Sequence, residues 1–321
     1  MRETDKTKRT DRLESPQASP PTHEGESAKH ELANGEEWVC RMVTTPGGLQ
    51  EVLSKATADG LLAISALGDS EDGHSANLIG ISLALVSGES FYIPLAHQQP
   101  PPADAQAGAN ESESEEKGVK WPSWEGPGGV SGALEMLRVV LEDPSILKVG
   151  HNIKFIITIL TWNMEAGGPL RLERFDDVML IAYTLFAGKG SKYELGDMVA
   201  EHFGGSMISL REIAQAAGLK RGKPQLEKLD PNLVLKWGAE HSAYAVCLHR
   251  YLRPRLVKNG VVTPYETMER PLVQVSPRAR FALCSAAKYC AVTVGDDVAC
   301  PGAGVIDPTK IFGRTSLYTA P

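Results

Sequence analysis

The sequence predicts an α/β fold with a mixed central sheet flanked by helices. Strand-like runs come first, at residues 61–67, 77–86 and 90–95, and helical spacing dominates from residue 131 onwards. The run 61–67 is apolar at nearly every position, which is typical of a central strand covered on both faces. The next two runs are joined by a short Ser-Gly-Glu connection, so two antiparallel strands are expected beside the central one. Strands early and helices late in the chain indicate an α/β domain.

The other elements follow from periodicity and from the residues that begin and end helices. A strand at 38–43 leads through a Pro-Gly-Gly turn to an amphipathic helix at 49–58, and a short strand is expected at 146–149. The last long helix opens with Asp230-Pro231, an N-cap followed by proline at the first helical position. Further helices are expected at residues 131–141, 152–162, 177–186, 191–203 and 231–256.

Composition divides the chain into three parts. Residues 1–37 hold nine acidic and six basic residues with no aromatic residue, so they bury too little apolar surface to fold and are expected to be disordered. Residues 38–257 form the predicted domain, interrupted by a flexible acidic insertion at 98–130 that contains three consecutive prolines. Residues 258–321 form an irregular tail.

Charge and hydropathy exclude several classes of protein. The net charge of −7 argues against a strongly basic nucleic-acid coat, although a local basic groove remains compatible with it. We expect no membrane segment, because no apolar run approaches 18 residues, and no targeting peptide. The five cysteines form no C-x-x-C pair and are expected to be reduced and unligated. The expected location is therefore cytoplasmic.

Six stretches, in order, resemble the proofreading 3′–5′ exonuclease domain of family A DNA polymerases, the bacterial DNA polymerase I type. They are SANLIGIS at 75–82, FYIPLAH at 91–97, LKVGHNIKF at 147–155, FDDVML at 175–180, WGAEH at 237–241 and YETMERPLV at 265–273. The resemblance covers roughly residues 38–275. It implies a ribonuclease H-like fold and a lineage of DNA replication and repair, with residues 258–321 resembling a truncated start of the polymerase region.

The resemblance also implies a defined chemistry. Enzymes of this family remove nucleotides from a 3′ end with two divalent metals, Mg²⁺ or Mn²⁺, and a water nucleophile. Hard cations need oxygen ligands, so the family gathers four carboxylates from three motifs. These are Asp-x-Glu on the first buried strand, an Asp after the Asn-x-Lys-aromatic run, and Tyr-x-x-x-Asp on a late helix, where i, i+4 spacing puts both side chains on one face.

This sequence lacks those carboxylates. The first motif falls on Ser65 and Leu67, the second on Ile156, and the third on Trp237 and His241. No catalytic residue and no metal ligand are therefore assigned, and no metal cofactor is expected. Asp69-Ser70-Glu71 is a displaced Asp-x-Glu, but Gly68 is expected to end the strand, which favours turn residues over a shifted metal site.

Other positions of the family pattern remain. By resemblance, His151, Asn152, Lys154, Phe155, Met179 and Lys189 are the candidate nucleic-acid-binding residues. A lysine on phosphate and an aromatic ring on a base suit a single strand. The structural alternative is that Asn152 caps a helix and Phe155 lies in the core, and both roles are compatible. Asp177 is expected to cap the following helix, and Trp237 to pack in the core.

Three functional hypotheses follow. The leading one is a degenerate exonuclease domain that retains at most binding of a single-stranded DNA 3′ end. The second is a working metal-dependent exonuclease that uses Asp69 and Glu71. The third is a structural module that docks on a separate polymerase chain. No polymerase motif and no preceding 5′-nuclease domain is expected, and a fragment, a split gene product and a decaying copy all fit the sequence.

Overall fold

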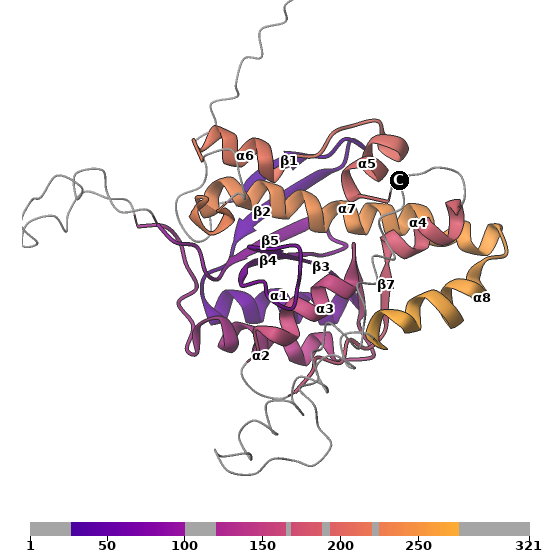
Figure 1. Cartoon of the computed structure of the whole chain (residues 1–321), viewed down its shortest axis with the longest axis horizontal. Helices are drawn as coiled ribbons and strands as arrows, with labels where there is room; N and C mark the ends of the chain where they lie inside the picture. Colours follow the sequence, from indigo (N-terminus) through magenta and orange to yellow (C-terminus); the bar gives the residue numbers. More distant parts are fainter. Residues whose placement is uncertain (1–26, 100–119, 165–167, 188–192, 220–224, 276–321) are drawn as a thin grey trace, which may run out of the picture. The chain divides into compact units, whose positions relative to one another are not determined.

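The computed structural model describes residues 27–99, 120–164, 168–187, 193–219 and 225–275. The chain divides into two compact units, Met1–Pro277 and Arg278–Pro321, and the second lies outside the described residues. The first unit is built around a seven-stranded mixed sheet with helices on both faces (Figure 1). The predicted fold class is confirmed.

The sheet has the strand order β1-β2-β5-β4-β3-β6-β7. Its strands are β1 (Ala28–Glu31), β2 (Glu37–Met42), β3 (Leu61–Gly68), β4 (Leu78–Ala84), β5 (Glu89–Pro94), β6 (Leu147–Gly150) and β7 (Phe175–Asp177). β3 pairs antiparallel with β4 and parallel with β6, so the strand predicted to be central has a neighbour on each side. β7 pairs with β6 alone and forms one edge of the sheet.

Helices cover the two faces of the sheet in different groups (Figure 1). α1 (Pro46–Asp59), α2 (Gly129–Leu141) and α3 (Ile153–Trp162) share one apolar cluster with β3, β4 and β5. On the other face the long α7 (Pro231–Lys258) packs with α4 (Val178–Phe186), α5 (Leu195–Phe203) and α6 (Leu210–Ala216). A short turn at Leu226–Lys228 precedes α7.

The chain after α7 turns into one more helix. Residues 262–275, which we call the C-terminal helix, contain α8 (Val262–Pro264) and a π-type turn at Tyr265–Glu269. Tyr265 and Val273 point inward and are buried, whereas Met268 and Leu272 are exposed. The C-terminal helix therefore packs on the domain through one side only.

Helix starts follow the capping signals in the sequence. The Asn152 side chain accepts a hydrogen bond from the Phe155 amide at the start of α3, and Asp177 and Asp230 cap α4 and α7 in the same way. Each cap satisfies an amide that has no partner inside its own helix. These three predicted caps are confirmed.

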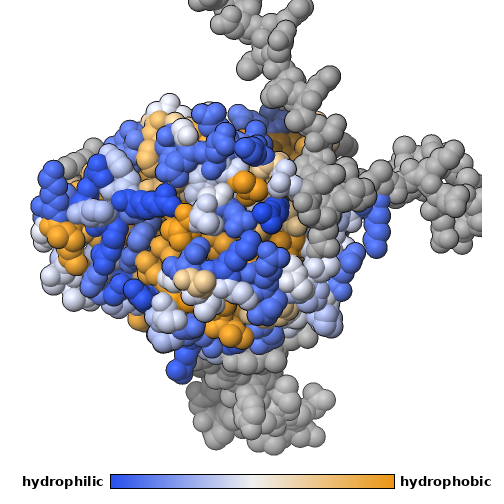
Figure 2. Space-filling model, turned by 180° about the vertical axis from the view of Figure 1, so that it is seen from behind, coloured by the Kyte–Doolittle hydropathy of each residue, from blue (hydrophilic) through white to orange (hydrophobic). Residues whose placement is uncertain are grey.

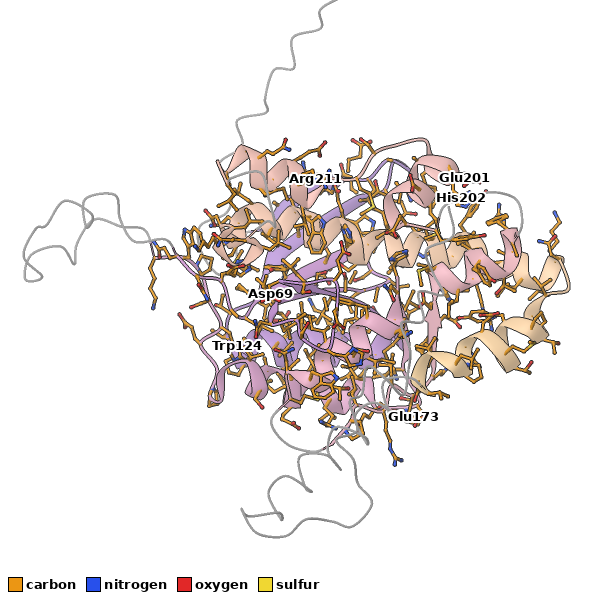
Figure 3. All side chains as sticks on the ribbon, viewed as in Figure 1. Asp69, Trp124, Glu173, Glu201, His202 and Arg211 are labelled. Atoms are coloured by element: carbon orange, nitrogen blue, oxygen red, sulfur yellow. The ribbon has the colours of Figure 1, made fainter. Side chains whose placement is uncertain are left out.

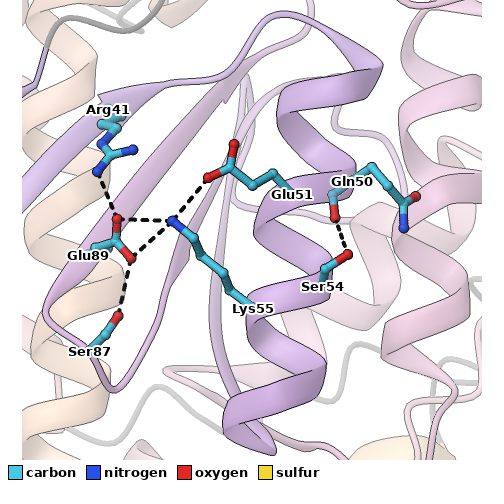
Figure 4. A network of polar contacts seen from close by, with 7 residues as sticks. All are labelled: Arg41, Gln50, Glu51, Ser54, Lys55, Ser87 and Glu89. Carbon is cyan, nitrogen blue, oxygen red and sulfur yellow. Dashed lines mark hydrogen bonds and ion pairs between the residues drawn. The ribbon is translucent and has the colours of Figure 1, made fainter.

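Glu89, the first residue of β5, links strand β2 to helix α1 through ion pairs (Figure 4). Its carboxylate lies 2.9 Å from Arg41 Nη2 on β2 and 3.3 Å from Lys55 Nζ on α1. Lys55 also lies 3.1 Å from Glu51, one turn earlier on α1. Because these groups are partly exposed, each pair contributes only about 0.5 kcal/mol. The network mainly fixes how α1 sits across β2 and β5.

The first strand corrects the predicted domain boundary. Residues 28–31 were placed in the disordered acidic segment, but they form β1, which pairs with β2. Leu32 is buried, and the His30 ring lies 2.8 Å from Glu240 on α7. The partners that order this polar segment come from distant parts of the chain, which composition alone does not reveal. Residues 1–26 lie outside the described residues.

The predicted insertion at 98–130 also ends earlier than expected. Residues 100–119 lie outside the described residues, but Trp124 packs into the core, and its amide donates to the Pro94 carbonyl at 2.9 Å (Figure 3).

α6 was not predicted, although Ser209 and Glu212 form a capping box there. None of the described helices is long and apolar enough to cross a membrane. Cys40 and Cys247 are free and buried.

Candidate functional site

Ser65 and Leu67, the first two positions matched to metal ligands, lie near the end of β3. Side chains alternate along a strand, so Ala63, Ser65 and Leu67 share one face. Ala63 and Leu67 both belong to apolar clusters that include α7 residues, which places Ser65 between them beneath α7. Leu67 is 3% exposed and packs in the same cluster as Trp237. The structure therefore brings the first and third matched motifs together.

Trp237 and His241 lie one turn apart on α7. Their ring centroids are 4.0 Å apart, and the His241 Nδ1 atom lies 3.2 Å from the Trp237 carbonyl oxygen. Burial, with a smaller effect of His151, lowers the pKa of His241 to about 3. The imidazole is therefore neutral at pH 7. An uncharged ring thus stands at the position that the sequence resemblance matches to a carboxylate.

α7 approaches the sheet closely at this point. A Cβ atom built on Gly238 would lie 3.2 Å from the Ser82 Cβ atom, and Ser82 is the direct partner of Ser65 in the β3–β4 ladder. Gly238 therefore allows the helix to lie against the strands beside the first motif. The site is closed by packing at the position where the family pattern has charged groups.

Ile156, matched to the second motif, lies in the first turn of α3 and is 2% exposed. A Cβ atom built on Gly150 would lie 3.1 Å from its Cδ1 atom and 2.9 Å from the Ile64 carbonyl oxygen. Ile156 thus fills space between the end of β6 and β3. It belongs to the apolar cluster on the α1–α3 face, whereas Leu67 and Trp237 belong to a cluster on the other face.

The displaced Asp-x-Glu lies in the β3–β4 connection (Figure 3). Asp69 accepts hydrogen bonds from both the backbone and the side-chain amide of Asn77, at 2.9 and 2.6 Å. Asp72 in turn accepts from the His74 amide and lies 3.0 Å from the His74 ring. Glu71 is exposed. Asp69 and Asp72 are committed to hydrogen bonds within the turn, as the turn interpretation expects.

These residues do not fit a two-metal centre. Divalent Mg²⁺ and Mn²⁺ need several anionic or carbonyl oxygens, and the matched side chains are one hydroxyl, two alkyl chains, an indole and a neutral imidazole. Within the part of the chain that the structure describes, no three His, Cys, Asp or Glu side chains are grouped so that they would hold a metal ion.

Five of the six residues matched to nucleic-acid binding, all except Lys189, lie where α3 and α4 begin. The Asp177 carboxylate accepts from the Asn152 amide at 3.1 Å, the Ile153 amide at 2.7 Å and the Met179 amide at 3.0 Å. Asn152 has a left-handed backbone with φ of 57°, a conformation that asparagine tolerates. One buried carboxylate thus joins two helix starts, and we call these residues, 151–155 with 177–179, the helix-junction turn.

The side chains of the helix-junction turn differ in accessibility. Lys154 is exposed, and His151, Asn152, Phe155 and Met179 are each partly exposed. Phe155 packs against the apolar core, as the structural alternative predicts. Part of its ring remains accessible to solvent. The His151 ring lies 2.7 Å from the Tyr193 carbonyl oxygen. Lys189 lies outside the described residues.

Asp177 has a larger role than the predicted helix cap. It is 1% exposed; burial raises its pKa, while His151 and the three amide donors act in the opposite direction. The position of Asp177 before a helix predicted its role as a cap of α4. Its bonds to the amides of residues 152 and 153 could not be predicted, because those residues are about 25 positions away in the sequence. Tyr193, which holds His151, and Glu240, which holds β1, were also missed, because their partners are set by tertiary structure.

The fold and the sequence place the chain among known proteins in two steps. Among solved structures, Escherichia coli RNase D is similar to this chain: it is 17% identical with a TM-score of 0.48, covering 74% of this chain and 50% of RNase D. The catalytic core of RRP6 from Trypanosoma brucei is 10% identical with a TM-score of 0.49, covering 79% of this chain and 67% of that core. No model of a protein family matches the chain.

Sequence comparison then identifies a more particular relationship. DNA polymerase I of Rhizobium leguminosarum is 27% identical over 240 residues, and that of Treponema pallidum is 25% identical over 250 residues. These matches cover 72% and 74% of this chain but only 21% and 24% of the polymerases. The chain spans less than a quarter of the length of these relatives. The chain is therefore distantly similar in sequence to part of DNA polymerase I.

Proposed function

We propose that this domain is catalytically degenerate and binds the 3′ end of single-stranded DNA without cleaving it. The observation that carries the proposal is the packing of the positions matched to metal ligands. Leu67 and Ile156 are buried in apolar clusters on opposite faces of the sheet, and the His241 ring is half-buried and neutral. A carboxylate or a metal at these positions would need charge and solvation that the surroundings do not supply.

The binding part of the proposal rests on the helix-junction turn. Two helix N-termini converge there, and each carries partial positive charge that favours phosphate. Lys154 adds a full positive charge in the first turn of α3, and Phe155 adds a partly accessible ring. A cation beside an aromatic surface is the usual arrangement for holding a single strand without reading its sequence. Asp177 neutralises part of the helix charge, so modest affinity is expected.

The test uses a 3′-labelled single strand with the full chain in Mn²⁺. We expect a mobility shift that weakens with salt and no shortening of the strand. Lys154→Ala should lower the affinity and reduce the slope of log affinity against log salt by about 0.7, the value for one phosphate contact on a single strand. Lys258→Ala, an exposed lysine at the end of α7, is the matched control and should bind like the parent chain.

Each contrary result has a distinct meaning. Stepwise shortening of the label would show a working exonuclease and remove the degenerate assignment. Absence of any shift for the parent chain would remove DNA binding. Equal effects of Lys154→Ala and Lys258→Ala would show diffuse charge attraction instead of a site at the helix-junction turn. Because Asp69 is committed to Asn77 in the turn, no observation favours the shifted metal site.

One observation supports a second candidate function, docking on a polymerase chain. Met268, Leu272 and Val275 lie at i, i+4 and i+7 on the outer side of the C-terminal helix and are 62%, 62% and 58% exposed. Elsewhere apolar side chains form separate patches among polar ones, as on the face in Figure 2. The occupant we favour is a DNA polymerase I-type polymerase region, because the relatives that match this chain are more than four times longer than the matched part.

The docking candidate is tested by mixing the full chain with a purified polymerase region of a DNA polymerase I. A complex on size exclusion that is lost in Leu272→Glu, but kept in Val139→Glu, would support it. Val139 is an apolar residue on α2 that is more exposed than Leu272, at 74% against 62%. If the chain instead associates with itself and Leu272→Glu abolishes this, the exposed apolar side of the C-terminal helix binds a second copy. If the parent chain stays monomeric in every mixture, the docking candidate is wrong.

A further inference from the structure

A buried network beyond the matched motifs connects the C-terminal helix to the helix-junction turn. The Tyr265 hydroxyl donates to Asp176 Oδ1 at 3.0 Å and accepts from the Asp177 amide at 3.1 Å. Tyr265 is 0% exposed, Asp176 2% and Asp177 1%. One hydroxyl therefore contacts two consecutive residues at the end of β7, and the second of them holds the starts of α3 and α4.

The position of β7 explains why a tyrosine is used. β7 has three residues and forms the edge of the sheet, paired on one side with β6. Along an edge strand, amides that point away from the sheet have no ladder partner. The Tyr265 hydroxyl supplies that partner for Asp177 and occupies the place that a further strand would fill. It thereby fixes the peptide plane between Asp176 and Asp177.

Asp176 anchors the same hydroxyl from the other side. Its carboxylate lies 2.8 Å from His249 Nε2, 3.4 Å from Arg253 Nε and 3.6 Å from Arg270 Nη1. Burial acts to raise the pKa of Asp176, but the His249 hydrogen bond and the Arg253 charge outweigh it and hold the pKa below its ordinary value. The carboxylate is charged and well paired, so the hydroxyl proton has a fixed acceptor.

We infer that Tyr265 is a positioning residue for the helix-junction turn, acting through Asp177 on the backbone of Asn152, Ile153 and Met179. The inference rests on the proposed function for its link to DNA, but the contact itself does not. The path is short: the Asp177 amide donates to the Tyr265 hydroxyl, and the carboxylate of the same residue accepts from the Asn152, Ile153 and Met179 amides. Buried hydrogen bonds in low-dielectric surroundings reinforce one another, so loosening the first weakens the rest. A displacement of the C-terminal helix would reach the turn by this route.

The experiment compares Tyr265→Phe with Tyr244→Phe in the full chain. Tyr244 is also a buried tyrosine, and its hydroxyl accepts a hydrogen bond from the Ala33 amide, at 2.8 Å, in the connection between β1 and β2. Both variants remove one buried hydroxyl, so both should lower the melting temperature. Only Tyr265→Phe should change the turn. Amide hydrogen exchange by NMR reports this without any DNA.

We expect exchange at the Ile153 and Met179 amides to be about tenfold faster in Tyr265→Phe, the ratio for losing one buried hydrogen bond. The same amides should be unchanged in Tyr244→Phe. Equal exchange in the two variants would overturn the inference, whatever happens to DNA binding. Affinity for the 3′-labelled single strand should also fall in Tyr265→Phe alone. If the parent chain binds no DNA, the proposed function fails, while the exchange result still decides the role of Tyr265.

Discussion

The His97 imidazole lies between the Tyr92 hydroxyl and the Leu229 carbonyl, 2.8 Å from each. A carbonyl only accepts, so Nδ1 carries the proton toward Leu229, and Nε2 accepts from the Tyr92 hydroxyl. Burial lowers the pKa of His97 to about 4. The folded chain therefore keeps this ring neutral, whereas the unfolded chain protonates it near pH 6.5.

This residue sets a testable pH dependence of stability. Because the folded pKa lies below the unfolded one, the contribution is complete above pH 6.5 and is lost as pH falls toward 4. The loss is about 3 kcal/mol across that interval. Urea unfolding measured at several pH values should show the decline, and His97→Gln should flatten it by that amount. If the free energy of unfolding falls equally with pH in the parent chain and in His97→Gln, other groups cause the decline. His241 would be the first of these to test.

Single residues also carry the proposal that the domain is catalytically degenerate. Ser65, Leu67, Ile156 and His241 each sit where the resemblance puts a carboxylate, and each is compatible with its surroundings as it stands. Burial makes two of the four substitutions hard to reverse one at a time. A buried carboxylate without a partner costs several kcal/mol, more than an average single substitution.

At the scale of elements, the starts of α3 and α4 depend on one side chain. Asp177 accepts three amide hydrogen bonds from two helices, whereas Asp230 accepts a backbone amide bond from Asn232 at the start of α7 alone. An ordinary N-cap contributes about 1 kcal/mol. Three buried donors that lose their acceptor together cost more, because each carries its own desolvation penalty.

The two aspartates therefore form a matched pair for measurement. Asp177→Ala should lower the free energy of unfolding by about 3 kcal/mol or more, and Asp230→Ala by about 1 kcal/mol. Chemical denaturation of both variants at pH 7 decides between them. Similar losses for the two would mean that Asp177 acts as an ordinary cap and that the helix-junction turn is held by packing.

At the scale of the whole molecule, the domain combines an exonuclease-like sheet with a neutral, packed centre. A two-metal site must hold several carboxylates close together, and their mutual repulsion is relieved only when cations bind. With Ser65, Leu67, Ile156 and His241 in those places, the fold carries no such repulsion. Its stability should therefore be independent of divalent metal.

Restoring the carboxylates reverses this expectation. The variant Ser65→Asp, Leu67→Glu, Ile156→Asp, His241→Asp should be destabilised by several kcal/mol in EDTA. Mn²⁺ should then raise its melting temperature, by the equivalent of about 2.7 kcal/mol when the metal is at a hundred times its dissociation constant. The parent chain should show no shift with metal.

The double variant Ser65→Asp, His241→Asp leaves both buried alkyl residues in place and serves as the foldable control. A folded quadruple variant without a metal-dependent shift would contradict the alignment of this chain with the family motifs. Thermal melts with and without Mn²⁺ are sufficient for all three chains.

Local chemistry in the sequence was enough for much of the fold. Asn152, Asp177 and Asp230 cap helices where their positions predicted, and the run at 61–67 is the central strand β3. The substituted site stays a prediction, because it depends on how the motifs are aligned. These features depend on neighbours within a few residues or on the order of motifs.

Long-range partners decided the rest. β1 is ordered by pairing with β2 and by Glu240, about 200 residues away. Trp124 joins the core from within a polar, proline-rich stretch.

The sequence alone was enough for the fold class and for the similarity to part of DNA polymerase I, and it predicts that four carboxylates are missing. Only the tertiary structure showed that Leu67 and Ile156 pack on opposite faces, that Asp177 joins two helix starts and that Tyr265 holds Asp177. The physical reason is that capping and strand periodicity act over a few residues. Burial and hydrogen bonding between elements depend on which distant segments the fold brings into contact.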